Sequence, residues 1–356
     1  MLGWATENGP WVMKTFGTTF EKNPYSWNNK ANVLYIDQPA GVGFSYADCK
    51  GSPADCIFND TTTGVDNLSF IRSWYDKFPE YKMHNLYISG ESYAGIYGPT
   101  MANAIVDYNN VTAQIDQIPL KGMAIGNGCT NWTFDTMPAT LNMTYGHALF
   151  NTELWDKMSS EFCDYSGIEF DQNPSASCMG YLDEFDELID GIDLYQIYLS
   201  NYANEFELCT AEENEKTKKA MGLGLEETTP RRPHYPYSMT GDYTPWFNRH
   251  LKSKTGGKGF CLSGDPLTAY LSNSAVKEAL HVSSNVAAWE GCSNINYTVL
   301  QKGSEWIWRK LKGKIRMLKY SGDKDGVVPT DGSIRWINGL NWDTVQPWQP
   351  FMDANN

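Results

Sequence analysis

The chain has 356 residues, of which 41% are hydrophobic and 20% are charged. This composition excludes a disordered, collagenous or coiled-coil protein and supplies enough apolar surface for a large core. The formal net charge of −14 at pH 7 argues against a nucleic-acid partner, because such proteins present a basic surface to the phosphates. The sequence lacks an apolar run of the ~18 residues that a membrane-spanning helix needs, so we expect no such helix.

Cysteine and glycosylation patterns point to an oxidising compartment. The chain contains eight cysteines and six Asn-x-Ser/Thr sequons, which together favour a secretory-pathway protein with disulfide bonds. No C-x-x-C pair occurs, so neither a zinc ribbon nor a thioredoxin-type site is expected. The candidate glycosylation sites are Asn59, Asn67, Asn110, Asn131, Asn142 and Asn296.

Short apolar runs alternate with helical patterns in chain order. Residues 32–37 predict a buried strand that enters a loop, and residues 61–77 predict an amphipathic helix that ends near Pro79. The other predicted elements are strands over residues 85–89, 121–126 and 315–320 and a helix over residues 93–106. Strands that alternate with helices indicate an α/β protein with a mainly parallel central sheet and helices on both faces.

Residues 150–260 have a different character. Their apolar residues follow a helical rhythm, as in residues 183–199, whereas residues 216–232 are polar and contain glycine, as loops do. We expect a helical insertion that lies over the end of the sheet, inside a single domain that spans residues 1–356.

The strongest chemical signal is Gly90-Glu91-Ser92-Tyr93-Ala94, which follows a predicted strand and leads straight into a helix. A strand, a tight turn and a helix form the context of a nucleophile elbow, in which small residues let the turn expose a serine. Ser92 is therefore the candidate nucleophile. The backbone N–H of Tyr93 is a candidate oxyanion donor, because Tyr93 comes one residue after the nucleophile. The helix that follows directs its positive end at the same site. The alternative is an ordinary serine in a strand–helix turn.

A second signal follows the last predicted strand. The acid of a catalytic triad follows the nucleophile in such proteins, on a loop after a late strand. We expect Asp325 to be this acid, with Asp323 as second choice; either could instead be a turn-forming aspartate beside glycine. All five histidines precede Asp325, so the chain has no histidine where the triad base is expected. Without a base, a serine is a poor nucleophile.

Several motifs together are similar to those of the serine carboxypeptidase family and occur in the family's order. Residues 32–46, Asn-Val-Leu-Tyr-Ile-Asp-Gln-Pro-Ala-Gly-Val-Gly-Phe-Ser-Tyr, are the most specific of them. The others are Glu7–Pro10, Gly90–Gly95, Ile125–Gly128, Ala279–His281, Cys292–Ser293 and Tyr320–Asp325. The resemblance implies an α/β-hydrolase fold with a helical insertion, in a lysosomal, vacuolar or secreted protein that acts at acidic pH.

The resemblance also implies roles for single residues. Ser92 resembles the nucleophile, Asp325 the triad acid, and Tyr93 the residue that supplies one oxyanion N–H. Glu91 resembles the acid that helps to bind the C-terminal carboxylate of the substrate, which a glutamate can do only while protonated; crowding by a second acid raises a pKa in this way. The alternative for Glu91 is a surface acid. The disulfides that fit the family are Cys163–Cys178 and Cys209–Cys261; Cys49–Cys56 could close a local loop, and Cys292 is left odd.

Two family segments have no counterpart in the chain. One is a glycine-rich segment that supplies the second oxyanion N–H, and the other is the loop that carries the catalytic histidine. Residues 1–20 also lack the features of a signal peptide. We therefore expect the coding region to extend beyond both ends, and the chain as it stands to be nearly inactive as a hydrolase.

The leading interpretation is a serine-type carboxypeptidase that releases C-terminal amino acids from peptides through an acyl-enzyme on Ser92, without a metal or organic cofactor. An acyltransferase on the same scaffold would use the same residues and pass the acyl group to an alcohol instead of water. A non-catalytic binding protein is the third interpretation. The expected partners are peptide or protein C-termini, and a homodimer is compatible with the sequence.

Overall fold

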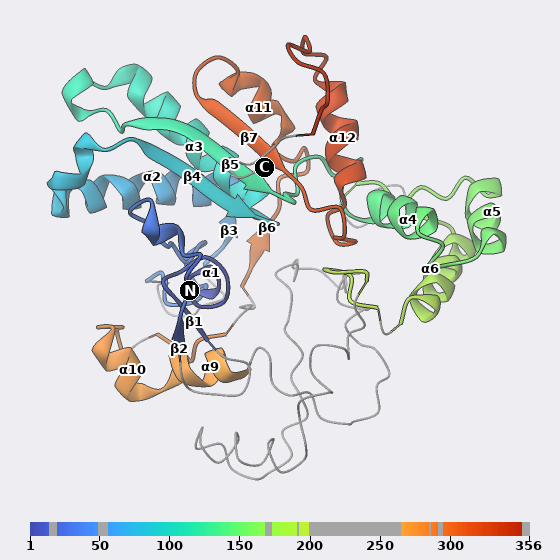
Figure 1. Ribbon diagram of the computed structural model, residues 1–356, viewed down its shortest axis with the longest axis horizontal. Coiled ribbons are helices and arrows are strands. Elements are labelled where there is room, and N and C mark those ends of the chain that lie inside the picture. The colour runs from blue at the N-terminus through green and yellow to red at the C-terminus, as the bar shows by residue number, and fades with distance from the viewer. Residues whose placement is uncertain are drawn as a thin grey trace.

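The computed structural model describes residues 1–13, 20–48, 56–167, 173–190, 192–198, 265–284, 286–290 and 295–350. Its main sheet has three parallel strands in the order β4 (Leu86–Glu91), β5 (Leu120–Gly126) and β7 (Arg316–Tyr320) (Figure 1). The strands predicted over residues 85–89, 121–126 and 315–320 are thereby confirmed. Because all three run parallel, their carboxyl ends meet at one edge of the sheet.

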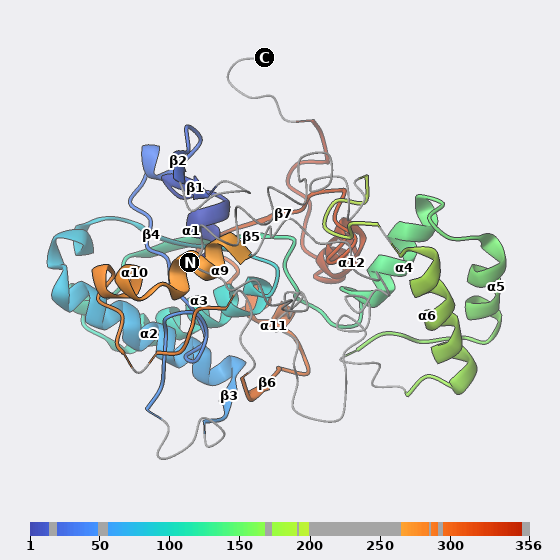
Figure 2. The ribbon, with the colours of Figure 1, turned by 90° about the horizontal axis from the view of Figure 1, so that it is seen from below.

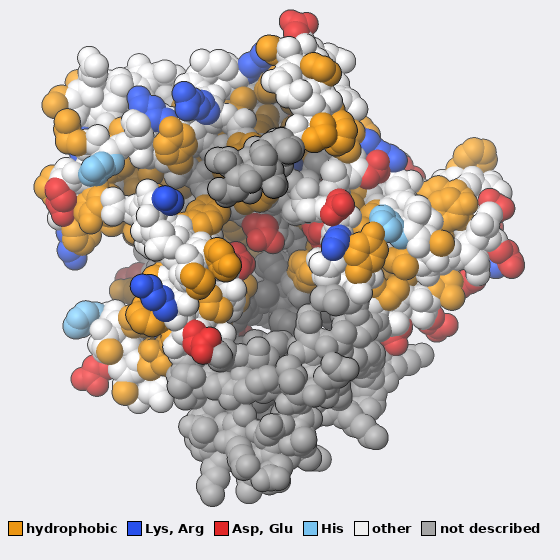
Figure 3. All heavy atoms as spheres, in the orientation of Figure 1, with side chains coloured by type: hydrophobic (Ala, Val, Ile, Leu, Met, Phe, Trp, Pro, Cys, Tyr) orange, Lys and Arg blue, Asp and Glu red, His pale blue; other side chains and the backbone are white. Residues whose placement is uncertain are grey.

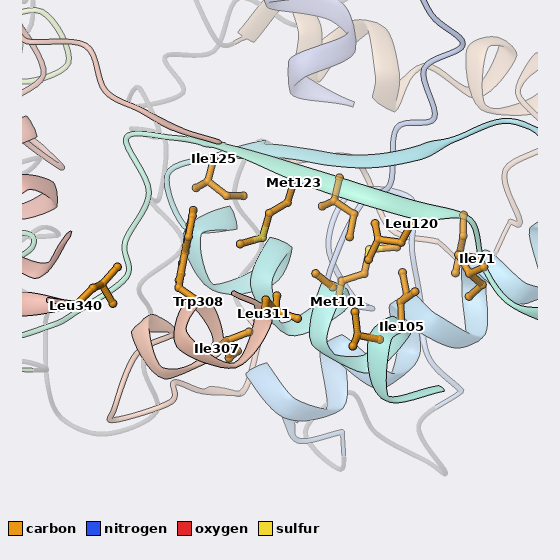
Figure 4. Packing of buried hydrophobic residues seen from close by; sticks show 14 of the residues in the cluster. Ile71, Met101, Ile105, Leu120, Met123, Ile125, Ile307, Trp308, Leu311 and Leu340 are labelled. Carbon is orange, nitrogen blue, oxygen red and sulfur yellow. The ribbon is translucent and has the colours of Figure 1, made fainter. Parts of the chain in front are cut away.

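Two long helices cover one side of this sheet. α2 (Asp60–Lys77) and α3 (Ala94–Val111) lie there together with α11 (Glu305–Leu311) (Figure 2). Their apolar side chains meet those of β5 in the main core, as Figure 4 shows for Ile105, Met123 and Trp308. Fully burying a side chain of this size contributes about 1.5–3 kcal/mol, so this layer provides much of the stability of the fold. The described residues confirm the predicted helical layer on this side.

Local signals explain where the two helices begin and end. The Asn59 side chain accepts a hydrogen bond from the Thr62 backbone N–H, and the Thr62 hydroxyl in turn accepts one from the Asn59 N–H, which closes a capping box at the start of α2. The helix predicted over residues 61–77 is confirmed. The helix predicted over residues 93–106 is also confirmed but continues to Val111, because no glycine or proline interrupts the additional turn.

Two sequence predictions are wrong in part. Residues 32–37 form no strand, because they have no hydrogen-bonded neighbouring strand among the described residues, although Ile36 still packs against the main core. The helical stretch predicted over residues 183–199 ends early, since α6 (Ala176–Leu188) stops before Asp190-Gly191, a turn-favouring pair.

Short elements surround the main sheet. The antiparallel pair β1 (Trp11–Met13) and β2 (Phe20–Lys22) follows α1 (Leu2–Thr6), and β3 (Phe58–Asn59) pairs in parallel with β6 (Tyr297–Thr298). The remaining helices outside the insertion are α9 (Asp265–Ser272), α10 (Ser274–Ala279) and α12 (Thr330–Gly339), with 3-10 turns at Trp27–Asn29, Pro79–Met83 and Gln114–Asp116. In the described part of the chain, no helix combines the length and apolar character required to cross a membrane.

A second group of helices extends away from the sheet. α4 (Met137–Gly146), α5 (Thr152–Ser160) and α6 share a core of their own, and the predicted disulfide Cys163–Cys178 joins the segments before and within α6 (Figure 1). The helical character predicted for the start of the insertion is confirmed. The predicted loop over residues 216–232 and the cysteines Cys49, Cys209, Cys261 and Cys292 lie outside the described residues. Cys56 is disulfide-bonded, as predicted for this residue.

Candidate active site

Ser92 occupies a strained turn between β4 and α3. Its φ angle is +58°, a left-handed conformation that costs a residue with a side chain about 1–2 kcal/mol. Two backbone hydrogen bonds hold it there. The Ser92 N–H donates to the Gly126 carbonyl oxygen at 3.1 Å, and the Ser92 carbonyl oxygen accepts from the Cys129 N–H at 3.0 Å. A strained serine at the carboxyl end of a strand is the geometry of a nucleophile elbow.

Small residues make this turn sterically possible. A Cβ atom on Gly90 would lie 2.4 Å from the Cβ of Ala94, and one on Gly95 would lie 2.2 Å from the backbone oxygen of Cys129. Neither clash can be relieved by moving a flexible side chain. The Ala94 Cβ is fixed at the start of α3, and the Cys129 oxygen belongs to the backbone. The elbow therefore depends on glycine at both positions.

Asp325 lies on the loop after β7, held by three donors. Its carboxylate accepts hydrogen bonds from the backbone N–H groups of Val327 at 2.8 Å and Val328 at 3.2 Å, and from the side-chain amide of Asn127 at 2.9 Å. Burial raises the pKa of Asp325 and the negative charge of Glu91 adds to this, whereas the three hydrogen bonds oppose it. The second choice, Asp323, is exposed.

Asn127 is a site residue to which the sequence interpretation gave no role. It follows β5 at the same edge of the sheet, with φ +33°. Its side-chain oxygen accepts from the Gly322 N–H at 2.8 Å, so one side chain holds both the start of the Asp325 loop and Asp325 itself. The available signal was the motif Ile125–Gly128, which supported the resemblance without an assigned function.

The insertion also contacts the Asp325 loop. The backbone N–H of Gly326 donates to the Leu194 oxygen at 2.6 Å, and that of Ile197 donates to the Lys324 oxygen at 3.0 Å. The end of the described insertion therefore fixes the loop that carries the candidate acid.

Two glutamates interact electrostatically beside the elbow. The side chain of Glu91 is accessible to solvent, yet the protein atoms around it and the charge of Glu7 raise its pKa. Burial likewise raises the pKa of Glu7, and both glutamates contribute to raising the pKa of Tyr320. Glu7, Glu91 and Tyr320 therefore lie near enough for the glutamate charges to affect the other two groups. Sequence reasoning missed Glu7, although Glu7–Pro10 was among the motifs of the resemblance.

The side chain of Tyr93 points away from solvent. Only 5% of its surface is exposed, and its hydroxyl donates a hydrogen bond of 3.0 Å to Asp60, the first residue of α2. Tyr93 also precedes the first residue of α3, so its backbone N–H lies at the positive end of that helix.

Three of the five histidines, His84, His147 and His281, lie in the described residues. The ring nitrogen Nδ1 of His147 lies 2.8 Å from the Met143 oxygen, and the ring of His84 lies beside Tyr81. His281 follows α10 with φ +55°, and the remaining two, His234 and His250, lie outside the described residues.

Acidic side chains line a hollow at the centre of one face of the molecule (Figure 3). The hollow lies where the carboxyl ends of the parallel strands converge in Figure 1, which is where open α/β sheets bind their ligands. In the described ranges, no group of three or more His, Cys, Asp or Glu side chains is arranged to hold a metal ion.

The six sequons differ in access. Asn110 is exposed at the end of α3, whereas the Asn67 side chain is 4% exposed and hydrogen-bonded to Gln38. The side-chain amide of Asn131 donates to the Glu305 carboxylate, and that of Asn142 donates to the Pro138 carbonyl oxygen. Asn59, which caps α2, and Asn296 are half-buried.

Comparisons with known proteins agree on one family. The family model described as serine carboxypeptidase matches residues 1–356. Serine carboxypeptidase-like 21 of Arabidopsis thaliana is 32% identical over 375 residues, covering 100% of this chain and 73% of that protein. The lysosomal protective protein of Mus musculus is 30% identical over 349 residues, which cover 95% of this chain and 68% of that protein.

A solved structure supports the fold. The crystal structure of KEX1(DELTA)P, a prohormone-processing carboxypeptidase from Saccharomyces cerevisiae, superposes with a TM-score of 0.61 at 20% sequence identity and covers 99% of this chain and 68% of that one. This likeness, with the parallel sheet and its helices, confirms the predicted α/β-hydrolase fold. Taken with the match along its whole length, the chain belongs to the serine carboxypeptidase family.

Proposed function

We propose that this protein is a serine-type carboxypeptidase that releases C-terminal amino acids from peptides through an acyl-enzyme on Ser92. The observation that carries the proposal is the strained Ser92 at the end of β4, on the same sheet edge as Asp325 and Glu91. The elbow with Glu91 and the acid loop lie at one edge because β4, β5 and β7 run parallel. Glu7 comes from the segment after α1.

The described residues supply the nucleophile, one oxyanion donor and the acid of the reaction. The Ser92 oxygen attacks the last peptide carbonyl, and the Tyr93 backbone N–H stabilises the oxyanion with the help of the positive end of α3. Asp325 orients the base, which accepts the serine proton and passes it to the nitrogen of the C-terminal amino acid as the peptide C–N bond breaks. Water then attacks the ester on Ser92, giving its proton to the same base, and the shortened peptide leaves as Ser92 regains its proton. The proposal requires a histidine base that the described residues do not supply.

The glutamate pair explains why the enzyme would act on chain ends. A free C-terminal carboxylate is repelled by two ionised glutamates but accepts a hydrogen bond when one of them is protonated. Because each glutamate of the pair has a raised pKa, this protonated state persists to higher pH than for an isolated glutamate. Binding of the C-terminus is therefore strongest at acidic pH and weakens as the pH rises through the raised pKa.

A secretory compartment fits the disulfide bond and the acidic pH that binding of the C-terminus would need. The disulfide Cys163–Cys178 needs oxidising conditions, and one relative is named as a lysosomal protein. None of the relatives reported above is named as an acyltransferase, so hydrolysis is the reaction we propose. A homodimer and a single domain over residues 1–356 stay predictions.

The test uses the protein expressed from its complete coding sequence in a secretory host. We expect release of the C-terminal residue from a blocked dipeptide, no release from the same dipeptide as its amide, and no turnover by Ser92→Ala. A fluorophosphonate probe should label the wild type and spare Ser92→Ala. A folded protein that neither turns over nor takes the label would refute the proposal and favour a non-catalytic role.

A further inference from the structure

A buried carboxylate lies directly behind the elbow. Asp60 is 0% exposed, and it is hydrogen-bonded to Tyr93, a residue with a role in the proposed reaction. Its side chain accepts hydrogen bonds from the hydroxyls of Tyr93 at 3.0 Å and Tyr297 at 2.5 Å and from the backbone N–H of Leu300. The three donors come from the elbow, from β6 and from the segment after β6.

We propose that Asp60 is a positioning residue that holds Tyr93, and with it the backbone N–H that would stabilise the oxyanion. The inference rests on the proposed function. Asp60 begins α2 directly after β3, and β3 pairs with β6, so one carboxylate joins the start of α2, the elbow and β6. Tyr93 is thus tied to a part of the fold that does not itself belong to the turn.

The ring and the hydroxyl of Tyr93 contact different neighbours. Its ring lies 4.8 Å from that of Tyr97, 6.2 Å from that of Trp132 and 6.1 Å from that of Tyr297, measured between ring centroids. Such ring contacts are less directional than a hydrogen bond. The hydrogen bond to Asp60 restrains the position of the hydroxyl along the axis of the side chain. An oxyanion donor must be held to within about 0.5 Å, so a small slide would impair it.

A carboxylate suits this position better than any neutral side chain. It only accepts hydrogen bonds, and its two oxygens can serve all three donors at once. Burial raises the pKa of Asp60, but the hydrogen bonds from Tyr297, Leu300 and Tyr93 oppose this, and the N-terminus of α2 favours the negative charge. An asparagine would turn its NH2 group toward either the Leu300 N–H or the two hydroxyls, so at least one donor would lose its acceptor.

The first experiment measures steady-state hydrolysis of a blocked dipeptide by the protein expressed from its complete coding sequence. Loss of an oxyanion donor costs ~10²–10³ in rate, so displacing one through Asp60→Asn should lower kcat by about 10–100-fold and leave KM nearly unchanged. The matched control is Asp66→Asn, an exposed aspartate on the same helix, which should change neither constant. A merely structural role would lower the amount of folded enzyme and not kcat per titrated active site.

The second experiment uses Tyr93→Phe, which removes one hydroxyl and keeps the ring, in case Asp60→Asn does not fold. It should lower kcat as Asp60→Asn does, and the double variant should be no slower than the slower single one, because both changes break the same contact. Unchanged kcat in Tyr93→Phe, or additive losses, would overturn the role of Asp60 while the proposed function stands. A wild type without turnover would overturn both.

Discussion

Asn127→Ala tests whether one side chain secures the loop of the candidate acid. The change removes a hydrogen bond to the Asp325 carboxylate, which contributes about 1.5–3 kcal/mol, and one from the Gly322 N–H, which contributes about 0.5–1.5 kcal/mol. Since the amide group is shared among several acceptors, we expect a total loss of about 3 kcal/mol in the free energy of unfolding.

This loss corresponds to a measurable change in melting temperature. Unfolding entropy of about 2.1 cal/mol/K per residue gives ~0.75 kcal/mol/K for 356 residues, so 3 kcal/mol lowers Tm by about 4 °C. The assay is thermal unfolding followed by tryptophan fluorescence. It needs no substrate and can be done on the chain itself.

A matched control separates the hydrogen bonds from the backbone conformation. Asn341 also has a positive φ, +53°, and its amide donates to the Gly339 oxygen at 3.2 Å in an exposed position. Asn341→Ala therefore has a similar backbone cost without the contacts to the acid loop. A decrease in Tm for Asn127→Ala no larger than that for Asn341→Ala would refute the reasoning.

Three further predictions concern other features. Gly95→Ala should destabilise the chain by about 1–3 kcal/mol in a thermal melt, since the new Cβ would lie 2.2 Å from a backbone oxygen. The control Gly180→Ala, in α6 with open space around it, should stabilise the chain by about 0.5–1 kcal/mol, and equal effects of the two changes would contradict the reasoning. In the protein expressed from its complete coding sequence, Glu91→Gln should abolish most of the increase of KM between acidic and neutral pH, because the group with the raised pKa is removed. An unchanged dependence of KM on pH would be evidence against the glutamate pair. In a secretory host, Asn110→Gln should remove a glycan detectable as a mobility shift and Asn67→Gln should not, because only Asn110 is exposed; the opposite pattern would show that the accessibility argument fails.

Local sequence was sufficient where a pattern and its structural cause lie close together in the chain. The elbow is an example: Gly90, Ser92 and Gly95 are neighbours in sequence, and their strain follows from the direct passage of β4 into α3. The disulfide Cys163–Cys178, which the family resemblance implied, also joins residues that are close in the chain. Residues 32–37 show the limit, because an apolar run becomes a strand only when another strand pairs with it.

The sequence by itself determined the family, the parallel strands and the candidate nucleophile and acid, because these reside in contiguous motifs. Only the tertiary structure decided which distant groups act on them: Glu7 beside Glu91, Asn127 on Asp325, and Asp60 behind Tyr93. For Asn127 and Asp325 the physical reason is that the parallel strands β5 and β7 bring their carboxyl ends together whatever their separation in the chain. Glu7 follows α1 and Asp60 begins α2, so their positions depend on how these helices pack. Hydrogen bonds and charge interactions between these groups depend on distances that no local pattern encodes.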